Sequence, residues 1–313
     1  MARGTATVVH LRSETSPGLA EAVAAYFAER DLAPTSRRVY ALTLDRLVVR
    51  LGAATPLAKI TPRTLSRFLA NEYSHLGPAS WNRTVATLGS FFAYTTRQCW
   101  TPTSPADALE RRRARSDPAA HARRRAIPEE ELRTFLDLDH PLREKTLWWL
   151  LYETAARANE VLALDVGGLD LPNRRAVVIG KGGRAELIGW ETKTARLLPR
   201  LLRGRKTGPV FLADIAPAPG RQPARVDLDS ESGRARVSYR RAAQLFRETS
   251  GGWTLHQLRH SRLTHLAEAG VALPLLMTKS RHTSLTSLAV YARPTFEAVA
   301  KATAALDPAR RHR

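Results

Sequence analysis

An arginine-rich segment in the first half of the chain limits most strongly how this sequence can fold. Residues 110–126 carry seven arginines without apolar periodicity, so they offer no face that could pack into a core. The pattern before this segment is purely helical, whereas the pattern after it is mixed. Because 313 residues exceed one comfortable small domain, we predict a flexible N-terminus at 1–16, a helical domain at 17–109, a linker at 110–126 and a second domain at 127–313.

The first domain is predicted to consist of short amphipathic helices. Apolar residues return at helical spacing in four stretches between Leu19 and Phe92. Thr61 followed by Pro62 is a favourable cap and first-turn pair for the third of them. Helices of this length and pattern make a compact four-helix bundle.

The second domain is predicted to combine helices with a small sheet. The letters RRAVVIGKGGRAELIGW indicate a β-hairpin, because β-branched residues precede a Gly182-Gly183 pair that can form a tight turn. The stretch Ala213–Arg236 is rich in Pro, Gly, Asp and Ser, and we predict an exposed loop there. The chain as a whole is therefore mainly α with a small β-sheet, an α+β domain after a helical bundle. Further helices are predicted at 129–138, 141–156, 192–202 and 239–249.

The charge balance indicates a polyanionic partner. The chain has 49 Lys and Arg against 29 Asp and Glu, a formal net charge of +20, and each phosphate contact releases a condensed counterion. Double-stranded DNA is the simplest such partner, although a GC-rich genome that favours arginine codons is an alternative explanation. The linker arginines could follow a DNA backbone or could simply be solvated. The candidates for DNA contact are Arg111, Arg112, Arg113, Arg123, Arg124 and Arg125.

Other features favour an intracellular protein. Cys99 is the only cysteine, so an intrachain disulfide is impossible and a reducing compartment suits the chain. The opening residues lack a secretory signal, and no run approaches the roughly 20 apolar residues of a membrane span. We expect a cytoplasmic, nucleoid-associated protein without a membrane partner.

Four short motifs after residue 150 carry groups that can act on a phosphodiester. Guanidinium groups neutralise phosphate oxygens, a lysine can protonate a leaving alkoxide, and a tyrosine hydroxyl can attack phosphorus. Helical spacing places the histidine and arginine of the third motif on one face. In chain order these candidate catalytic residues are Arg157, Lys181, His256, Arg259, His282 and Tyr291.

Each motif also has an ordinary structural explanation. Arg157 lies between apolar stretches and needs an anionic partner, which is Glu160 three residues later, a bound phosphate, or both. Lys181 in a turn could merely be solvated, and a helix tyrosine is commonly half-buried. His256 and His260 stand four residues apart, as in helical zinc sites, but no glutamate follows His256 and a third ligand is not evident. We therefore predict no metal site, and treat His260 and His265 as core histidines.

In this order the motifs resemble those of the tyrosine recombinases, the phage-integrase type of site-specific DNA recombinase. The family's Arg motif with a glutamate three residues later, its G-K-G hairpin, its H-x-L-R-H helix and its late His with a Tyr nine residues on are all matched. The resemblance runs from about Pro17 to Tyr291. It implies an N-terminal four-helix core-binding domain followed by a catalytic domain.

The sequence departs from the family pattern at several positions. Arg281 stands where a glycine usually precedes the late histidine, and Ala155 stands where the first motif usually has glycine. Leu288 and Arg293 replace a common threonine and a common histidine around the nucleophile. The loop at 213–236 is longer than in minimal members. None of these changes removes a reacting group, so they concern local packing.

The resemblance implies a role for each site residue. Tyr291 would attack the scissile phosphate to form a 3′-phosphotyrosine bond and a free 5′-hydroxyl. Arg157 and Arg259 would hold the non-bridging oxygens, while Lys181 protonates the departing oxygen. His256 would exchange a proton with the nucleophile. His282 would be a further phosphate donor, and Glu160 and His260 would support their neighbours.

The resemblance also implies partners. Strand exchange needs two duplexes, so a homotetramer would assemble on two DNA sites from protomers that are monomeric in solution. No cofactor, metal or ATP is required, because the phosphotyrosine conserves the bond energy. A C-terminal helix at Pro294–Leu306 could dock on its own domain or on a neighbouring protomer.

Three other functions compete with recombination. A type IB topoisomerase shares the phosphotyrosine chemistry but rejoins the original strand. A catalytically silent DNA-binding regulator on the same scaffold would have no need of an intact reacting set. A basic architectural protein would give Tyr291 no special role. The target sequence, and the choice between integration, excision and resolution, cannot be read from these residues.

Overall fold

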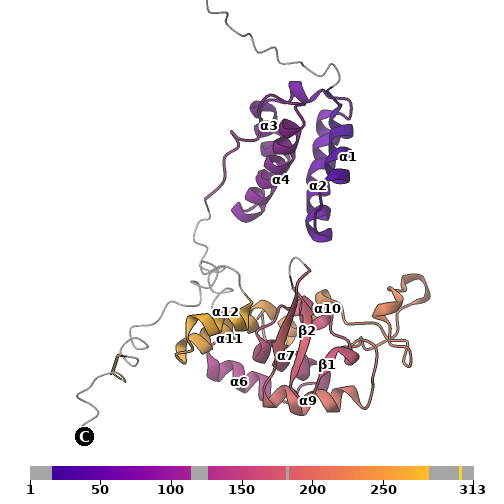
Figure 1. Cartoon of the computed structure of the whole chain (residues 1–313), viewed down its shortest axis with the longest axis vertical. Coiled ribbons are helices and arrows are strands. Elements are labelled where there is room, and N and C mark those ends of the chain that lie inside the picture. Colours follow the sequence, from indigo (N-terminus) through magenta and orange to yellow (C-terminus); the bar gives the residue numbers. More distant parts are fainter. Residues whose placement is uncertain (1–15, 114–125, 181–182, 282–302, 305–313) are drawn as a thin grey trace, which may run out of the picture. The chain divides into compact units, whose positions relative to one another are not determined.

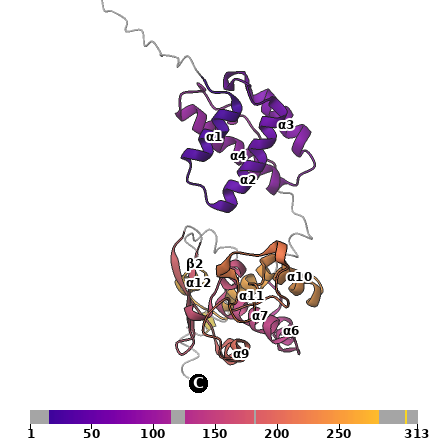
Figure 2. The ribbon, with the colours of Figure 1, turned by 90° about the vertical axis from the view of Figure 1, so that its right-hand side faces the viewer.

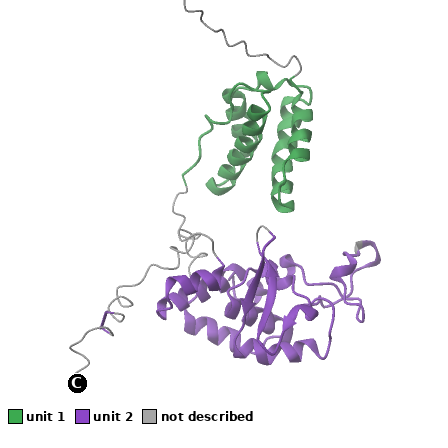
Figure 3. Ribbon diagram, in the orientation of Figure 1, with its two compact units in different colours: residues 1–116 green, residues 117–313 purple. Residues whose placement is uncertain are grey.

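The computed structural model describes residues 16–113, 126–180, 183–281 and 303–304. The chain divides into two compact units between Ser116 and Asp117 (Figure 3). This division falls within the predicted linker at 110–126. Among the described residues, no helix combines the length and the apolar character that crossing a membrane requires.

Unit 1 is a bundle of four α-helices, as predicted (Figures 1 and 2). Proline occupies the first turn of three of them, where its missing N–H costs nothing and its fixed φ favours the helix. The side chain of Thr61 accepts a hydrogen bond of 3.2 Å from the backbone N–H of Thr64, which confirms the predicted cap. The elements are α1 (Leu19–Glu29), α2 (Pro34–Leu51), the 3₁₀ turn η1 (Leu57–Lys59), α3 (Pro62–Tyr73) and α4 (Pro78–Arg97).

Aromatic side chains hold unit 1 together. The ring of Tyr26 packs edge-on against Phe91, with centroids 5.7 Å apart, and against Tyr94 at 5.4 Å. Its hydroxyl shares a hydrogen bond of 2.8 Å with Ser90. The buried ring thus joins α1 to α4 through both apolar contact and a satisfied polar group.

Unit 2 is mainly helical with a three-stranded antiparallel sheet in the order β1-β2-β3. The predicted strands pair, with Val177 opposite Leu187. The sheet lies beside α7 (Figure 1) and also contacts α8. The first elements are α6 (Glu129–Asp137), α7 (Leu142–Thr154), α8 (Ala158–Leu162), η2 (Val166–Gly168), β1 (Leu169–Asp170), β2 (Arg175–Ile179) and β3 (Ala185–Gly189). The later ones are α9 (Thr192–Leu202), η3 (Pro219–Arg221), η4 (Arg225–Asp227), α10 (Tyr239–Thr249), α11 (Leu255–Glu268) and α12 (Leu273–Ser280).

Helix α7 is the centre of unit 2. Trp148, Trp149 and Tyr152 are almost fully buried, and the helix packs against α9 and α11. Polar side chains of this helix, such as Thr146 and Glu153, are buried as well, so the helix lies inside the fold. The segment 213–236, by contrast, is exposed over most of its length.

The buried carboxylate of Glu153 on α7 caps the start of α9. It accepts backbone hydrogen bonds from Glu191 at 2.8 Å and from Lys193 and Thr194 at 3.2 Å. These N–H groups begin α9 and have no partner inside that helix. A negative charge at a helix start also interacts favourably with the helix dipole.

Replacing Glu153 with glutamine is expected to lower the free energy of unfolding by about 1.5–3 kcal/mol, the range for hydrogen bonds to a charged group. The amide keeps one acceptor oxygen but turns an NH₂ group toward backbone donors. Urea unfolding of the variant against the unchanged protein measures the loss. Glu130→Gln, at an exposed position of α6, is the matched control and should change stability by less than about 0.5 kcal/mol. Equal effects of the two substitutions would contradict the capping role.

Candidate active site

Helix α11 carries the H-x-L-R-H motif into the core of unit 2. The backbone N–H of Thr254 donates to Gln257 Oε1 at 2.9 Å and closes a capping box at the helix start. Leu258 is fully buried and Arg259 is only 2% exposed. The helix therefore fixes its arginine in the protein interior rather than at the surface.

The guanidinium of Arg259 ties two distant helix ends together. It donates to the carbonyl oxygen of Ala155 at the end of α7 and, at 2.6 Å, to that of Ser280 at the end of α12. Two residues after Ala155 comes Arg157, and directly after Ser280 comes Arg281. Arg259 thus brings the backbone of the first motif and of the segment before the late histidine to one place.

Arg157 and Glu160 form the ion pair that the sequence predicted. Arg157 Nη1 donates to Glu160 Oε1 at 2.7 Å, and the backbone N–H of Arg157 donates to Oε2 at 2.9 Å. The Glu160 side chain is 6% exposed whereas that of Arg157 is 39% exposed. The carboxylate is thus enclosed, and the guanidinium keeps an open side on which an anion could bind.

A third arginine, which the sequence did not single out for the site, reaches the same carboxylate. Arg281 Nη2 donates to Glu160 Oε2 at 2.6 Å. Burial on its own would raise the pKa of Glu160, but the hydrogen bonds from Arg157 and the nearby charge of Arg281 hold that pKa below its ordinary value. Glu160 is therefore an ionised carboxylate shared by two arginines. The sequence identified Arg281 only as a departure from the usual glycine, and its contact with Glu160 could not be predicted from that.

The departures at Ala155 and Arg281 share a backbone conformation. Their φ angles are 51° and 56°, in the left-handed region that glycine favours. Each residue ends a helix there, Ala155 after α7 and Arg281 after α12. The chain keeps the turn that glycine would make, at a cost of roughly 1 kcal/mol or more per residue.

The histidines of α11 differ in their surroundings. His256 is exposed, yet partial loss of water around its ring, then the charges of Arg259 and Arg157, lower its pKa. Loss of water and the charge of His256 also lower the pKa of His260, whose Nδ1 lies 3.4 Å from Thr264 Oγ1. A neutral His256 beside two arginines can accept a proton at neutral pH.

His265 is the core histidine that the sequence predicted. It is buried, and its Nδ1 shares a hydrogen bond of 2.9 Å with the Tyr152 hydroxyl. Its Nε2 lies 2.8 Å from the carbonyl oxygen of Ile127. One ring nitrogen therefore joins α11 to α7, and the other joins α11 to the segment before α6. In the described part of the chain, no group of three or more His, Cys, Asp or Glu could hold a metal ion.

Several predicted residues lie outside the described part of the chain. These are the catalytic candidates Lys181, His282 and Tyr291, the linker residues Arg123, Arg124 and Arg125, and most of the C-terminal segment 294–306. The hairpin is described up to Gly180, whose N–H donates to the carbonyl oxygen of Arg184 at 2.8 Å. The structure therefore brings Arg157, Glu160, His256 and Arg259 together, and the catalytic roles of all the candidate residues stay predictions.

The start of the linker packs on unit 1. The guanidinium of Arg112 stacks 3.6 Å from the centroid of the Trp81 ring and donates to the carbonyl oxygen of Leu76 at 2.7 Å. Arg111 and Arg113 are exposed. Arg112 therefore has a structural role on its own unit, and its two neighbours are the better candidates for DNA contact.

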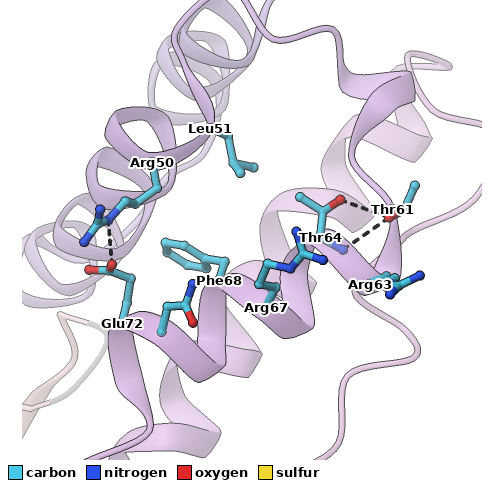
Figure 4. A pocket seen from close by; sticks show the side chains of 9 residues that line it. Arg50, Leu51, Thr61, Arg63, Thr64, Arg67, Phe68 and Glu72 are labelled. Atoms are coloured by element: carbon cyan, nitrogen blue, oxygen red, sulfur yellow. Dashed lines mark hydrogen bonds and ion pairs between the residues drawn. The ribbon is translucent and has the colours of Figure 1, made fainter.

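Unit 1 also carries a basic pocket of about 700 Å³ between α2 and α3. Arg50 pairs with Glu72 at 2.5 Å on one side (Figure 4). Arg63 and Arg67 lie on the other side and are exposed. The pocket thus has more positive than negative groups. Its lining is Arg50, Leu51, Thr61, Arg63, Thr64, Arg67, Phe68, Asn71 and Glu72.

Comparison with known proteins identifies the family. Residues 23–99 match the phage integrase N-terminal SAM-like domain. Tyrosine recombinase XerD of Mycobacterium leprae is 33% identical over 176 residues, 53% of each chain. Tyrosine recombinase XerC of Myxococcus xanthus is 28% identical over 233 residues, 70% of this chain and 73% of that protein. The chain thus spans about half the length of the first of these relatives.

Solved structures agree in fold. A lambda integrase dimer bound to a core site superposes with a TM-score of 0.66 at 16% identity, over 88% of this chain and 95% of that one. The Tn1549 transposon integrase with circular intermediate DNA gives 0.64 at 16%, over 92% and 99%. The described fold, a helical bundle followed by a mainly helical unit with a small sheet, is the one they share. Residues 125–298, more than half of the sequence, match the phage integrase family model, and the chain therefore belongs to that family.

Proposed function

We propose that this protein is a site-specific DNA recombinase that cuts and rejoins strands through a 3′-phosphotyrosine intermediate. The observation that carries the proposal is the convergence of Arg157, His256 and Arg259. The guanidinium of Arg259 donates a hydrogen bond to the backbone of Ala155, two residues before Arg157. Loss of water is the main cause that lowers the pKa of His256, and the charges of Arg259 and Arg157 lower it further. Two cations and a proton acceptor around one place suit the transition state of an attack on a phosphodiester.

The proposed reaction uses Tyr291 as nucleophile. Its oxygen forms a bond to the scissile phosphorus while its proton passes to His256. The bond between phosphorus and the 5′-oxygen breaks, and Lys181 gives the leaving oxygen its proton. Arg157 and Arg259 neutralise the non-bridging oxygens. Attack by the 5′-hydroxyl of another strand then reverses the same steps without ATP.

Double-stranded DNA is the proposed partner. The formal charge of +20, the exposed Arg111 and Arg113, and the basic pocket near Arg63 and Arg67 support it. The structures of the lambda and Tn1549 integrases, which have a similar fold, are complexes with DNA. We propose further that monomers assemble as a homotetramer on two sites, and that the protein acts in the cytoplasm on the nucleoid.

Formation of a covalent adduct tests the function. Purified protein is mixed with labelled, nicked DNA fragments from the sequence flanking its gene and run on a denaturing gel. We expect a protein–DNA band that mass spectrometry maps to Tyr291, and non-covalent binding that weakens by orders of magnitude over a few-fold rise in salt. Tight binding without any adduct would favour the silent regulator instead. An adduct with DNA relaxation but no exchange between two sites would favour a topoisomerase.

The pH dependence of cleavage is expected to report His256. Because its pKa is lowered from the ordinary 6.5, the ring stays neutral at pH 7 and can accept the proton of the nucleophile. Protonation, and with it loss of cleavage, should begin only below about pH 6.5. Single-turnover cleavage of a nicked substrate from about pH 5 to 9 measures this acid limb, the fall of the cleavage rate at low pH. His256→Asn should remove the limb and slow the plateau by at least about 100-fold, and an unchanged acid limb in that variant would contradict the role.

A further inference from the structure

Arg281 lies between two carboxylates that come from different elements. Its Nη2 donates to Glu160 Oε2 at 2.6 Å, and its Nε lies 3.7 Å from Glu186 Oε2. The side chain of Arg281 is 5% exposed. Glu160 belongs to α8, Glu186 to β3, and Arg281 follows α12. One buried guanidinium therefore meets three segments of unit 2.

Each carboxylate is in turn next to a motif of the site. Glu160 also accepts two hydrogen bonds from Arg157. Glu186 lies against Gly180, since a Cβ atom on residue 180 would come within 2.8 Å of Glu186 Oε2. Gly180 directly precedes Lys181 in the hairpin. Arg281 thus connects the arginine motif to the strand pair that carries the lysine.

Arg281 supplies one of the two positive charges that face the two carboxylates of this cluster. Arg157 and Arg281 are positive, and Glu160 and Glu186 are negative. Among the described residues, buried Glu186 Oε2 and Arg281 Nε have no hydrogen-bond partner, and their separation of 3.7 Å is too long for a hydrogen bond. Their attraction is purely electrostatic, and in a protected place it is stronger than in water.

The backbone at Arg281 carries a conformational cost that the contacts of its side chain can offset. A φ of 56° disfavours any residue with a Cβ by roughly 1 kcal/mol or more. The contact with Glu160 offsets that cost. Removing the guanidinium would leave Glu186 without the positive charge that lies 3.7 Å from its Oε2.

We propose that Arg281 is a positioning residue of the recombination site, which neutralises Glu186 and holds Glu160, and so fixes Arg157 relative to the hairpin strands that carry Lys181. This inference rests on the proposed function. It goes beyond the family pattern, in which a glycine without any side chain stands at this position. The arginine therefore supplies a contact that the glycine cannot make.

A double-mutant cycle tests the proposal by single-turnover cleavage of the nicked substrate at saturating protein. Arg281→Gly is expected to slow cleavage by about 10- to 100-fold, the cost of a misplaced site group, with DNA affinity within about 3-fold. Glu186→Gln alone should change cleavage by less than about 3-fold. The double variant should cleave at least about 3-fold faster than Arg281→Gly, because the unbalanced anion is gone, but slower than the unchanged protein, because the contact with Glu160 is still missing. A double variant as slow as Arg281→Gly would overturn the proposal in favour of a packing role.

Arg203→Gly is the matched control. Arg203 also ends a helix in the left-handed conformation, at φ 49°, but is exposed. Replacing Arg203 with glycine should leave the single-turnover cleavage rate unchanged. If the unchanged protein forms no adduct, the proposed function itself fails. If it forms one and Arg281→Gly cleaves at the same rate, only this inference is overturned.

Discussion

Replacing Tyr291 with phenylalanine is expected to abolish the covalent protein–DNA adduct completely. Phenylalanine has the same ring but no hydroxyl oxygen, so no bond to phosphorus can form. DNA affinity should stay within about 2-fold, since phosphate contacts by the arginines dominate binding. Adduct formation on nicked substrate is measured on a denaturing gel, and affinity is measured by fluorescence anisotropy.

The matched control for this prediction is Tyr239→Phe. Tyr239 begins α10 and is exposed, so loss of its hydroxyl should leave the adduct unchanged. An adduct that persists in Tyr291→Phe would show that another residue is the nucleophile. Mass spectrometry of the adducted peptide would then identify it.

Replacing Arg259 with lysine is expected to slow cleavage by about 100- to 1,000-fold, the loss that follows removal of one charge-stabilising donor. The planar guanidinium donates to the carbonyl oxygens of Ala155 and Ser280, and its delocalised charge is expected to stabilise the transition state. A lysine ammonium is a single point of charge and cannot do all three. The rate is measured per folded molecule, with the folded fraction taken from circular dichroism.

Arg262→Lys separates this effect from simple destabilisation. Arg262 is buried on the same helix, pairs with Glu191 and stacks 5.2 Å from the centroid of the Tyr152 ring. It lies outside the four motifs, so its replacement should lower stability without changing the cleavage rate of folded protein. A similar rate loss in both variants would mean that Arg259 acts only through packing.

Local sequence rules predicted the elements of this fold well. The Thr61 cap with Pro62 after it and the β-branched arm of the hairpin act through neighbours in the chain, so they are readable without a structure. The fold class and the family likewise followed from motifs whose order is a property of the sequence. Contacts between distant residues were not predictable in this way. The Arg112 side chain was assigned to a solvated linker or to DNA, yet it stacks on Trp81.

The sequence by itself determined which chemical groups the protein has and in which order they come. Only the tertiary structure decided which of them meet. Arg259 reaches the ends of α7 and α12, and Arg281 reaches Glu160 and Glu186, because the packing of α7 against α11 and of α11 against α12 brings remote segments together. A side chain at a glycine position carries no sign of its partner in the local pattern, since that partner is selected by burial and charge in the folded chain.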